Sequence, residues 1–369
     1  MKTYRVIGLM SGSSLDGLDI AYCEFTGKAH QWKYDLFATS YVPYPTKWRL
    51  RLANLTLQNA ITYIKTHIFY GHFLGEQVAA FISEQKIRSE VDFISSHGQT
   101  IFHQPENRLT SQIGDGAAIA AVTGLPVVCD FRSADVAQGG QGAPIVPIGD
   151  RVLFPNYSHC MNLGGIGNIS FNIPGTKIIG FDICAVNSLL NGLAEELDLP
   201  YDEDGRISAS GQVDHSLLDE ISTSWYFEKD YPKSLNGGWV VKTIVPVIRR
   251  HRAATKDKLS TACEHIAMQI GREVRRIYER EKVTQSAEHK MLLTGGGAFN
   301  EHLVTRIREH SPIPVDVPDD ELVKFKEAIV MGLVGVLRVE NQTNWLPEVT
   351  GAAKATIGGV IHQGSEKML

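Results

Sequence analysis

Two apolar runs near the start of the chain are separated by small and polar residues. The runs are Tyr4–Met10 and Leu18–Phe25, and residues 11–17 between them are small or polar except Leu15. This pattern is typical of a β-hairpin with a long glycine-bearing tip. Three further elements are predicted in order: a strand at Tyr34–Val42, a helix at Leu55–Gln85 and a buried strand at Val91–Ser95.

A second hairpin is predicted about half a chain length later. The strand-like segments His159–Leu163 and Ile169–Ile173 flank a tight glycine turn at Gly164–Asn168. We expect Asn187 to cap the helix that follows. The other elements predicted in this half are a strand at Lys177–Phe181 that ends in Asp182, a helix at Leu259–Glu281, a strand at Met291–Thr294 and a glycine turn at Gly295–Gly297.

The repeated plan of hairpin, third strand and helices predicts two α/β lobes rather than a solenoid of short repeats. Glycine and proline cluster around Pro147–Pro155. We therefore place the first lobe at residues 1–150 and the second at residues 151–369, with the last helix packing back on the first lobe. Lobes that face each other form a cleft, which is the usual location of a small-molecule site.

Composition narrows the class of protein. The 369 residues include 36 Lys and Arg against 41 Asp and Glu, so a general nucleic-acid-binding surface is not expected. The five cysteines form no CxxC pair, which favours reduced thiols over a zinc ribbon or disulfides. No signal sequence or membrane helix is recognisable, so we expect a soluble cytoplasmic protein without a membrane or nucleic-acid partner.

The glycine-bearing tips are candidates for phosphate binding. Glycine lets backbone N–H groups approach an anion, and Ser11, Ser13 and Ser14 add hydroxyl donors at the first tip. Asp16 and Asp19 offer carboxylate oxygens to Mg²⁺, directly or through water. The tip therefore suits a nucleoside triphosphate, although the same glycines also fit plain turns. The P-loop pattern and a helix-opening dinucleotide fingerprint are both absent, which excludes a P-loop and disfavours an oxidoreductase.

Other polar residues allow two interpretations each. Asp182 either accepts a proton from an attacking oxygen or caps a helix and bonds backbone amides. His97 and His103 do not have a usual zinc spacing, so we expect satisfied or surface histidines. Arg132 and Asp135 form either an ion pair or ligand contacts. The loop Gly139–Pro144, with three glycines and one amide side chain, either approaches a ligand or acts as a hinge between lobes.

A series of longer motifs runs in order along nearly the whole chain. They are Gly8–Asp19, Ser96–Thr100, Asp135–Ala137 with Gly139–Pro144, Asn162–Asn168, Tyr201-Asp202 with Gly205, Gly295–Gly297 with Asn300, Lys326–Ala328 and Val349–Ala352. Together they resemble the anhydro-N-acetylmuramic acid kinase family, with Ser13 where that family usually has Thr.

The resemblance implies a two-lobed actin/hexokinase-like (ribonuclease H-like) ATPase fold with an interlobe cleft. It also implies a cytoplasmic homodimer that acts in peptidoglycan recycling. The implied reaction uses ATP, Mg²⁺ and water on 1,6-anhydro-N-acetylmuramic acid. The anhydro ring is hydrolysed as O6 is phosphorylated, which yields N-acetylmuramic acid 6-phosphate and ADP.

The resemblance also implies roles for individual residues. Asp182 is the general base that activates water, and Glu327 lies near the reacting sugar. Mg²⁺ is held by Asp16, directly or through water. The residues expected to bind ATP are Gly12, Ser13, Ser14, Leu15, Asp16, Gly17, Leu18, Asp19, Gly164, Gly165, Gly295, Gly296 and Gly297. The residues expected to contact the sugar are His97, Gln99, Gln141, Asn168 and Asn187.

Two segments depart from the family pattern. The family usually continues after the base with Thr-Gly-Pro-Gly-Asn, whereas residues 183–187 read Ile-Cys-Ala-Val-Asn. Residues 231–239 also look divergent. Two alternatives therefore stay open: a kinase for a different sugar without ring opening, and a nucleotide-dependent switch or assembly protein with an actin-like fold.

Overall fold

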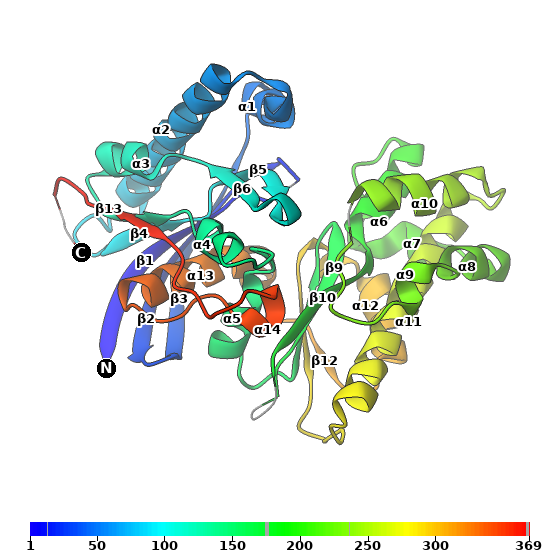
Figure 1. The fold of residues 1–369 in the computed structure, drawn as a ribbon. Coiled ribbons are helices and arrows are strands. Elements are labelled where there is room, and N and C mark those ends of the chain that lie inside the picture. Colours follow the sequence, from blue (N-terminus) through cyan, green and yellow to red (C-terminus); the bar gives the residue numbers. More distant parts are fainter. Residues whose placement is uncertain (13, 174–176, 236, 367–368) are drawn as a thin grey trace. The chain divides into compact units, whose positions relative to one another are not determined.

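The structure of the protein is a computed structural model, which divides into two compact units (Figure 1). It describes residues 1–12, 14–173, 177–235, 237–366 and 369. The first unit combines Met1–Phe154 with Phe325–Leu369, and the second is Pro155–Lys324. The last part of the chain thus groups with the first unit instead of continuing the second.

A mixed sheet of six strands forms the centre of the first unit. Strands β1 (Lys2–Met10), β2 (Gly17–Lys28) and β3 (Gln31–Pro43) pair antiparallel in succession, which confirms the predicted hairpin and third strand. The sheet has the order β13-β7-β4-β1-β2-β3, with β4 parallel to β1 and β7 parallel to β4. The added strands are β4 (Phe93–Ser96), β7 (Val127–Cys129) and β13 (Val360–His362).

The helix α2 (Ala60–Gln85) supplies much of the core of this unit. Its buried residues Tyr70, Leu74 and Val78 belong to the same apolar cluster as Ile7 of β1. The helix begins later than predicted because the Asn59 side chain accepts a hydrogen bond from the Thr62 N–H and so caps it.

Shorter elements complete the first unit. They are α1 (Thr46–Ala53), α3 (Gly116–Thr123), α4 (Arg132–Ala137), α5 (Val146–Leu153), α13 (Asp320–Val339, which starts in the second unit), α14 (Pro347–Thr350), the hairpin β5 (Gln99–Gln104) and β6 (Leu109–Ile113), and the 3₁₀ turns Leu55–Leu57 and Pro105–Asn107.

The second unit repeats the plan of the first. Strands β8 (His159–Leu163), β9 (Ile166–Phe171) and β10 (Ile179–Ala185) pair antiparallel in succession. Parallel strands β11 (Met291–Thr294) and β12 (Val315–Asp316) then extend the sheet beside β8, in the order β10-β9-β8-β11-β12. The α/β class and the repeated plan predicted from the two hairpins are confirmed.

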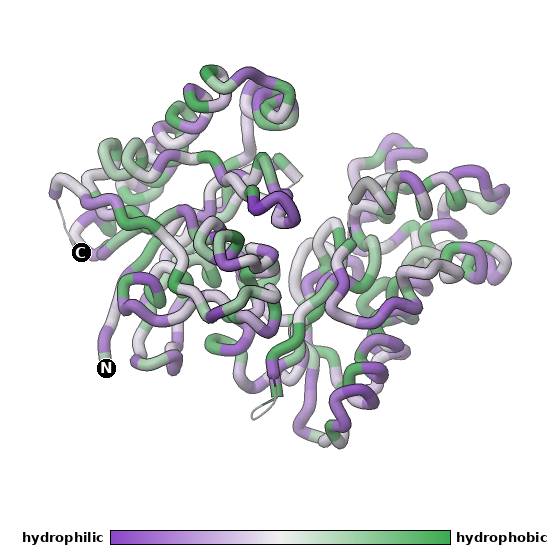
Figure 2. Tube along the Cα trace, in the orientation of Figure 1, coloured by the Kyte–Doolittle hydropathy of each residue, from purple (hydrophilic) through white to green (hydrophobic). Residues whose placement is uncertain are grey.

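The long helix α11 (Thr255–Glu281) forms the main support of the second sheet. Its residues Ile266, Ile270 and Val274 are fully buried in one cluster with Phe181 of β10. Figure 2 shows hydrophilic and hydrophobic residues alternating along α11, as expected for a helix with one buried face. The other helices are α6 (Asn187–Ala194), α7 (Arg206–Ser210), α8 (His215–Ser222), α9 (Trp225–Glu228), α10 (Gly237–Arg250), α12 (Glu301–His310), and the 3₁₀ turns Glu195–Leu197, Glu203–Gly205 and Gly296–Phe299.

The prediction that Asn187 caps α6 is wrong. Val186 occupies the cap position, and Asn187 is the first helical residue. The amides of the first turn are satisfied by the glycine turn instead: Gly164 O accepts from Asn187 N–H, and Gly165 O accepts from the N–H groups of Val186 and Ser188. A capping side chain is therefore not needed.

None of the helices, over the residues described, combines the length and apolarity that crossing a bilayer requires.

Candidate active site

A row of polar side chains crosses the end of the second sheet. Asn162 of β8 pairs with Thr294 of β11 on one side and with Asn168 of β9 on the other. Asn168 in turn pairs with Asp182 of β10. Directly paired residues on neighbouring strands project to the same face of the sheet. The predicted base and the predicted sugar contact Asn168 are therefore neighbours on one face.

The sequence pattern indicated a strand that ends at Phe181, with Asp182 directly after it. The structure instead places Asp182 inside β10. The register of the β9–β10 pair shifts between Asp182 and Cys184, which is a β-bulge. Bulges are common beside active sites because the extra residue redirects neighbouring side chains.

Among the described residues, three hydrogen bonds to other segments hold residue 182. Its N–H donates to Lys233 O over 3.2 Å, and its carbonyl accepts from the Tyr226 hydroxyl over 2.7 Å. The Leu235 N–H donates to the carboxylate oxygen Oδ2 over 2.8 Å. Part of the alternative interpretation is thus correct, since Asp182 does bond a backbone amide. That bond engages only one of the two carboxylate oxygens.

Burial raises the pKa of the Asp182 carboxyl above its ordinary value, and the hydrogen bond from the Leu235 amide opposes that rise. The residue as a whole is half-buried. A carboxylate with a raised pKa is a better proton acceptor than a free one, which suits the role of a general base.

The predicted phosphate-binding glycines of the second unit surround the same end of the sheet. A Cβ on Gly295, whose φ is +84°, would lie 2.4 Å from Asn162 Oδ1, and one on Gly297 would lie 2.8 Å from Leu163 Cβ. These two glycines are therefore required by close packing of β11 against β8. The Asn187 amide donates to Leu163 O over 2.9 Å and faces the same turn.

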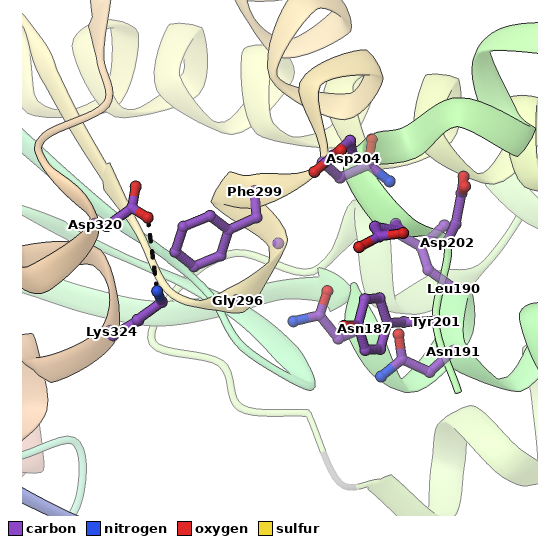
Figure 3. Close-up of a pocket in the computed structure, with 13 residues that line it drawn as sticks. Asn187, Leu190, Asn191, Tyr201, Asp202, Asp204, Gly296, Phe299, Asp320 and Lys324 are labelled. Carbon is purple, nitrogen blue, oxygen red and sulfur yellow. Dashed lines mark ion pairs between the residues drawn. The ribbon is translucent and has the colours of Figure 1, made fainter. Parts of the chain in front are cut away.

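A cavity of about 420 Å³ opens beside this turn within the second unit (Figure 3). Its lining combines two aromatic rings, amides, carboxylates and one lysine, which pairs with Asp320. The lining residues are Asn187, Leu190, Asn191, Tyr201, Asp202, Glu203, Asp204, Gly296, Gly297, Phe299, Asn300, Asp320 and Lys324.

The sequence reasoning missed Tyr201, Phe299 and Lys324 as site residues. Tyr201 and Phe299 stand within or between the motif residues that carried the family resemblance, and that position was the signal available. Asp202 and Asn300, by contrast, have structural roles as well. The Asp202 carboxylate accepts from two amides at the start of α7, and Asn300 caps α12.

Side-chain hydrogen bonds hold the hairpin tip of the first unit. The carboxylate oxygen Oδ1 of Asp16 accepts from the Ser14 hydroxyl over 2.7 Å and from the Gly17 N–H over 2.9 Å. Gln99 donates its side-chain amide to Gly12 O over 3.1 Å. Ser13, also predicted to bind ATP, lies outside the described residues.

Ser11 does not offer its hydroxyl to a ligand as the sequence suggested. Its Oγ lies 2.6 Å from the Tyr44 hydroxyl and 2.8 Å from the Tyr70 hydroxyl, and the residue is buried. Ser11 therefore fixes the end of β1 against α2.

Helix α13 crosses β1 at Gly8 and brings Glu327 toward the tip. A Cβ on Gly8 would lie 2.0 Å from Ala328 O, so only glycine permits this approach. The Glu327 charge acts on Asp19, whose pKa rises to about 7 through burial first, then Glu327, then Asp16. Burial also raises the pKa of Glu327, while the charges of Lys326 and Arg132 oppose that rise.

His97 orients Arg132. The Arg132 Nε donates to His97 Nε2 over 2.8 Å, and His97 Nδ1 lies 2.8 Å from Gly98 O. Burial lowers the pKa of His97 to about 3, so the ring is neutral, with its proton on Nδ1. Both ring nitrogens of His97 are therefore engaged in hydrogen bonds. The neutral ring fixes the position of the Arg132 guanidinium, which carries the positive charge.

The glycine-rich loop after α4 is pinned by a buried carboxylate. Asp135 accepts from the Gly142 N–H over 2.8 Å and from the Thr350 hydroxyl over 2.9 Å. The Gln141 N–H donates to Thr350 O, which leaves the Gln141 side chain exposed. Arg132 bonds Gly142 O rather than forming the ion pair with Asp135 that the sequence left open.

The predicted site residues thus gather in two groups, one in each unit. In the first unit they are Gly12, Ser14, Leu15, Asp16, Gly17, Leu18, Asp19, His97, Gln99, Gln141 and Glu327. In the second they are Gly164, Gly165, Asn168, Asp182, Asn187, Gly295, Gly296 and Gly297. No three His, Cys, Asp or Glu side chains among the described residues are arranged as a metal site, so the acidic residues at the tip do not by themselves form a complete cage.

Two solved structures align over most of the chain at low similarity. The activator of 2-hydroxyisocaproyl-CoA dehydratase from Clostridium difficile, with bound ADPNP, is 12% identical over 91% of this chain and 96% of that chain, with a TM-score of 0.44. The hexokinase from Schistosoma mansoni complexed with glucose is 10% identical over 90% of this chain and 85% of that chain, with a TM-score of 0.37.

Sequence similarity is much stronger. The family described as anhydro-N-acetylmuramic acid kinase matches residues 4–364. A relative of that name from Coxiella burnetii is 32% identical over 99% of both chains. Another from Trichormus variabilis is 34% identical over 98% of this chain and 97% of the relative. This chain is a kinase and belongs to the anhydro-N-acetylmuramic acid kinase family.

Proposed function

We propose that the protein uses ATP and water to convert 1,6-anhydro-N-acetylmuramic acid into N-acetylmuramic acid 6-phosphate and ADP, as a step of peptidoglycan recycling. The observation that carries the proposal is the setting of Asp182. Its carboxylate stands in a polar row at a β-bulge and accepts a hydrogen bond from the Leu235 amide, and the residue is half-buried. That setting suits a general base for water.

The proposed chemistry balances as follows. Asp182 takes a proton from water as the water oxygen bonds to C1 of the sugar. The C1–O6 bond breaks, and O6 bonds to the γ-phosphorus of ATP, from which ADP departs. The proton on Asp182 is then released to solvent. Asn168, opposite Asp182 in the ladder, is placed to bond a sugar hydroxyl or the water.

We assign the triphosphate to the tip residues 12–19 and to the turns at Gly164-Gly165 and Gly295–Gly297. The nucleoside is assigned to the cavity that Tyr201 and Phe299 line, because aromatic rings and convergent amides suit a purine and ribose. Mg²⁺ suits the acidic side of the tip, where Asp16 and Asp19 supply oxygen atoms. When bound, it would neutralise charge on the phosphates.

The departure from the family pattern after the base lies in the core. Ile183, Cys184, Ala185 and Val186 are all buried, with exposed fractions of 5% or less. They belong to the apolar cluster of the second unit. The changed residues therefore alter packing beneath the site, while the half-exposed Asn187 keeps the family residue. This supports the same sugar rather than a different one.

Isotope transfer from H₂¹⁸O tests the proposal. The protein is incubated with ATP, Mg²⁺ and the anhydro sugar in labelled water, and the product is analysed by mass spectrometry after short times. Label in a reducing-sugar 6-phosphate is expected. A phosphorylated product with an intact anhydro ring, or turnover only with a different sugar, contradicts it. A parallel sample of free product in labelled water corrects for exchange at C1.

A cytoplasmic homodimer is also proposed, from the family resemblance. Light scattering of the purified protein is expected to give twice the chain mass. ATP-dependent sedimentation of filaments, without sugar-stimulated turnover, would instead favour an assembly protein.

A further inference from the structure

A buried ion pair lies beside two aromatic residues that adjoin Asp182. Lys233 Nζ is 2.9 Å from Glu273 Oε1, and the two side chains are 0% and 1% exposed. The same ammonium group lies 5.7 Å from the ring centre of Phe181 and 5.1 Å from that of Tyr226. Phe181 precedes Asp182, and Tyr226 bonds the Asp182 carbonyl. The ammonium group of Lys233 therefore lies against two residues that adjoin the proposed base, Phe181 in sequence and Tyr226 through its hydrogen bond.

The ion pair anchors the segment 231–235 to helix α11. Glu273 also pairs with Arg276 over 2.9 Å, and Arg276 reaches Asp230 over 2.5 Å. One turn further along α11, Arg280 donates to Tyr231 O over 2.8 Å. Charged side chains of one helix thus fasten the segment at its start and at its middle residue, Lys233.

The segment 231–235 in turn holds the proposed base. Lys233 O accepts from the Asp182 N–H, and the Leu235 N–H donates to the Asp182 carboxylate. The side chain and the carbonyl of Lys233 therefore point to different partners, with α11 on one side and β10 on the other. Any shift of Lys233 moves the amide that bonds the carboxylate two residues later.

A buried ion pair is a costly way to secure a loop. Removing two charges from water costs several kcal/mol per ion, and replacement by apolar residues is often neutral or stabilising. Stability alone thus gives little reason for Lys233 and Glu273 to be charged. Directional bonds, however, fix the position of a backbone more narrowly than apolar packing does.

We propose that Lys233, paired with Glu273, is a positioning residue that keeps the Leu235 N–H against the Asp182 carboxylate and so maintains the geometry and protonation of the base. This inference rests on the proposed role of Asp182. Without the anchor, the amide withdraws, the carboxylate loses its fixed orientation, and its pKa rises, since the amide opposes the effect of burial.

The charged and titratable groups around Asp182 come from four elements. They are Lys233 on the segment, Tyr226 on α9, Cys184 on β10, and Glu273 with Arg272 and Arg276 on α11. Burial raises the pKa of the Cys184 thiol to about 12 and that of the Tyr226 hydroxyl further still. Both groups therefore stay neutral over roughly pH 5 to pH 9, which is the range in which the turnover of a carboxylate base is usually measured.

The test compares three variants with the wild type. K233M leaves Glu273 without its lysine, so the double variant K233M/E273L removes both charges and keeps the site apolar. K258M is the matched control, because Lys258 on α11 pairs with Glu196 in the same unit and does not bond Asp182. The turnover of the anhydro sugar is measured against pH, together with the melting temperature of each variant.

We expect K233M/E273L to remain folded, to lose turnover by about 10²-fold at neutral pH, and to move the acid limb of its pH profile upward, as for a misplaced catalytic group. K258M should keep the wild-type profile. A double variant with wild-type turnover and an unmoved acid limb would overturn the proposal. So would an equal loss at every pH, because that is the effect of a purely structural pair. Full activity of D182N would instead refute the proposed function itself.

Discussion

The two sheets share the order of five strands, to which the first sheet adds β13, but their corresponding ends carry different side chains. In the first unit the hairpin tip carries Asp16 and Asp19, and the Glu327 charge acts on Asp19. In the second unit the corresponding end carries Asn162, Asn168 and Asp182 in one row. One fold thus presents a cluster of like charges in one unit and, in the other, a row in which one carboxylate stands beside neutral amide side chains.

The pKa shifts reflect this difference. The pKa of Asp19 is raised to about 7 by burial together with two negative neighbours, Glu327 and Asp16. The pKa of Asp182 is also raised by burial, but the hydrogen bond from the Leu235 amide opposes that rise. Neutral hydrogen-bond donors can hold a carboxylate ready as a base, whereas like charges leave it in need of a cation. The first arrangement suits Mg²⁺ with a triphosphate, and the second suits proton transfer.

Removal of the proposed base should have the largest effect. D182N is expected to lower turnover by about 10²–10⁴-fold while ATP still binds, because the amide cannot accept the proton of water. ADP release measures turnover, and calorimetry measures ATP binding. D219N, on the exposed face of α8, is the control. Near-normal turnover of D182N would show that the row does not hold the base.

A side chain at the first tip should weaken nucleotide binding. A Cβ on Gly12 would lie 3.3 Å from Ser14 Oγ, so the branched side chain of G12V crowds the space assigned to phosphate. The Kd for ATP is expected to rise roughly tenfold, or about 1.4 kcal/mol. Isothermal titration with ATP and Mg²⁺ measures it. G192A, at a glycine with open space around it, should bind normally. Unchanged affinity of G12V would remove the tip from the ATP site.

The polar row of the second unit can be converted into a cluster of like charges. N168D places a carboxylate directly opposite Asp182 in the β9–β10 ladder. The added charge should raise the pKa of Asp182, since two neighbouring carboxylates resist joint ionisation. We expect the acid limb of the turnover profile to move upward by about one pH unit, a tenfold loss at low pH. N168A, which adds no charge, should leave the limb where it is. An unmoved limb in N168D would separate Asn168 from the base.

The like-charge cluster of the first unit can conversely be relieved by removing one charge. The expected effect on stability is smaller than the effects on turnover and binding above. Because the folded pKa of Asp19 is about 7 and its ordinary value is 3.8, the native state keeps a proton that the unfolded chain has lost. Its contribution to stability is therefore full below about pH 4 and is lost as pH rises through about 7. D19N should melt roughly 2–4 °C above the wild type at pH 8 and close to it at pH 4. D35N, at an exposed position on β3, is the control. A gap that does not widen with pH would contradict the charge cluster.

Most of the fold followed from local pattern. Short apolar runs around glycine tips predicted both meanders, and helical spacing predicted α2 and α11 within a few residues. The errors came where backbone groups of another segment took over a local role. Asn187 has the right side chain for a cap, but the carbonyls of Gly164 and Gly165 already satisfy the amides of that turn.

The candidate site was predicted less completely. The roles of Asp182 and the glycine turns stay predictions, and Ser11 was given a role that Tyr44 and Tyr70 exclude. His97 was expected to touch the sugar; the structure shows that it bonds Arg132, and its contact with the sugar stays a prediction. The cavity residues Tyr201, Phe299 and Lys324 were not singled out, because no local periodicity marks a residue that lines a cavity.

The sequence by itself determined the two α/β repeats, the glycine tips and the family, because these depend on patterns of neighbouring residues. Only the tertiary structure decided which carboxylate faces a charge and which faces an amide. Glu327 acts on Asp19 from a helix some 300 residues later in the chain, and Leu235 bonds Asp182 from across a loop. A pKa depends on burial and on what lies within a few ångströms, and both are set by segments that meet only after folding.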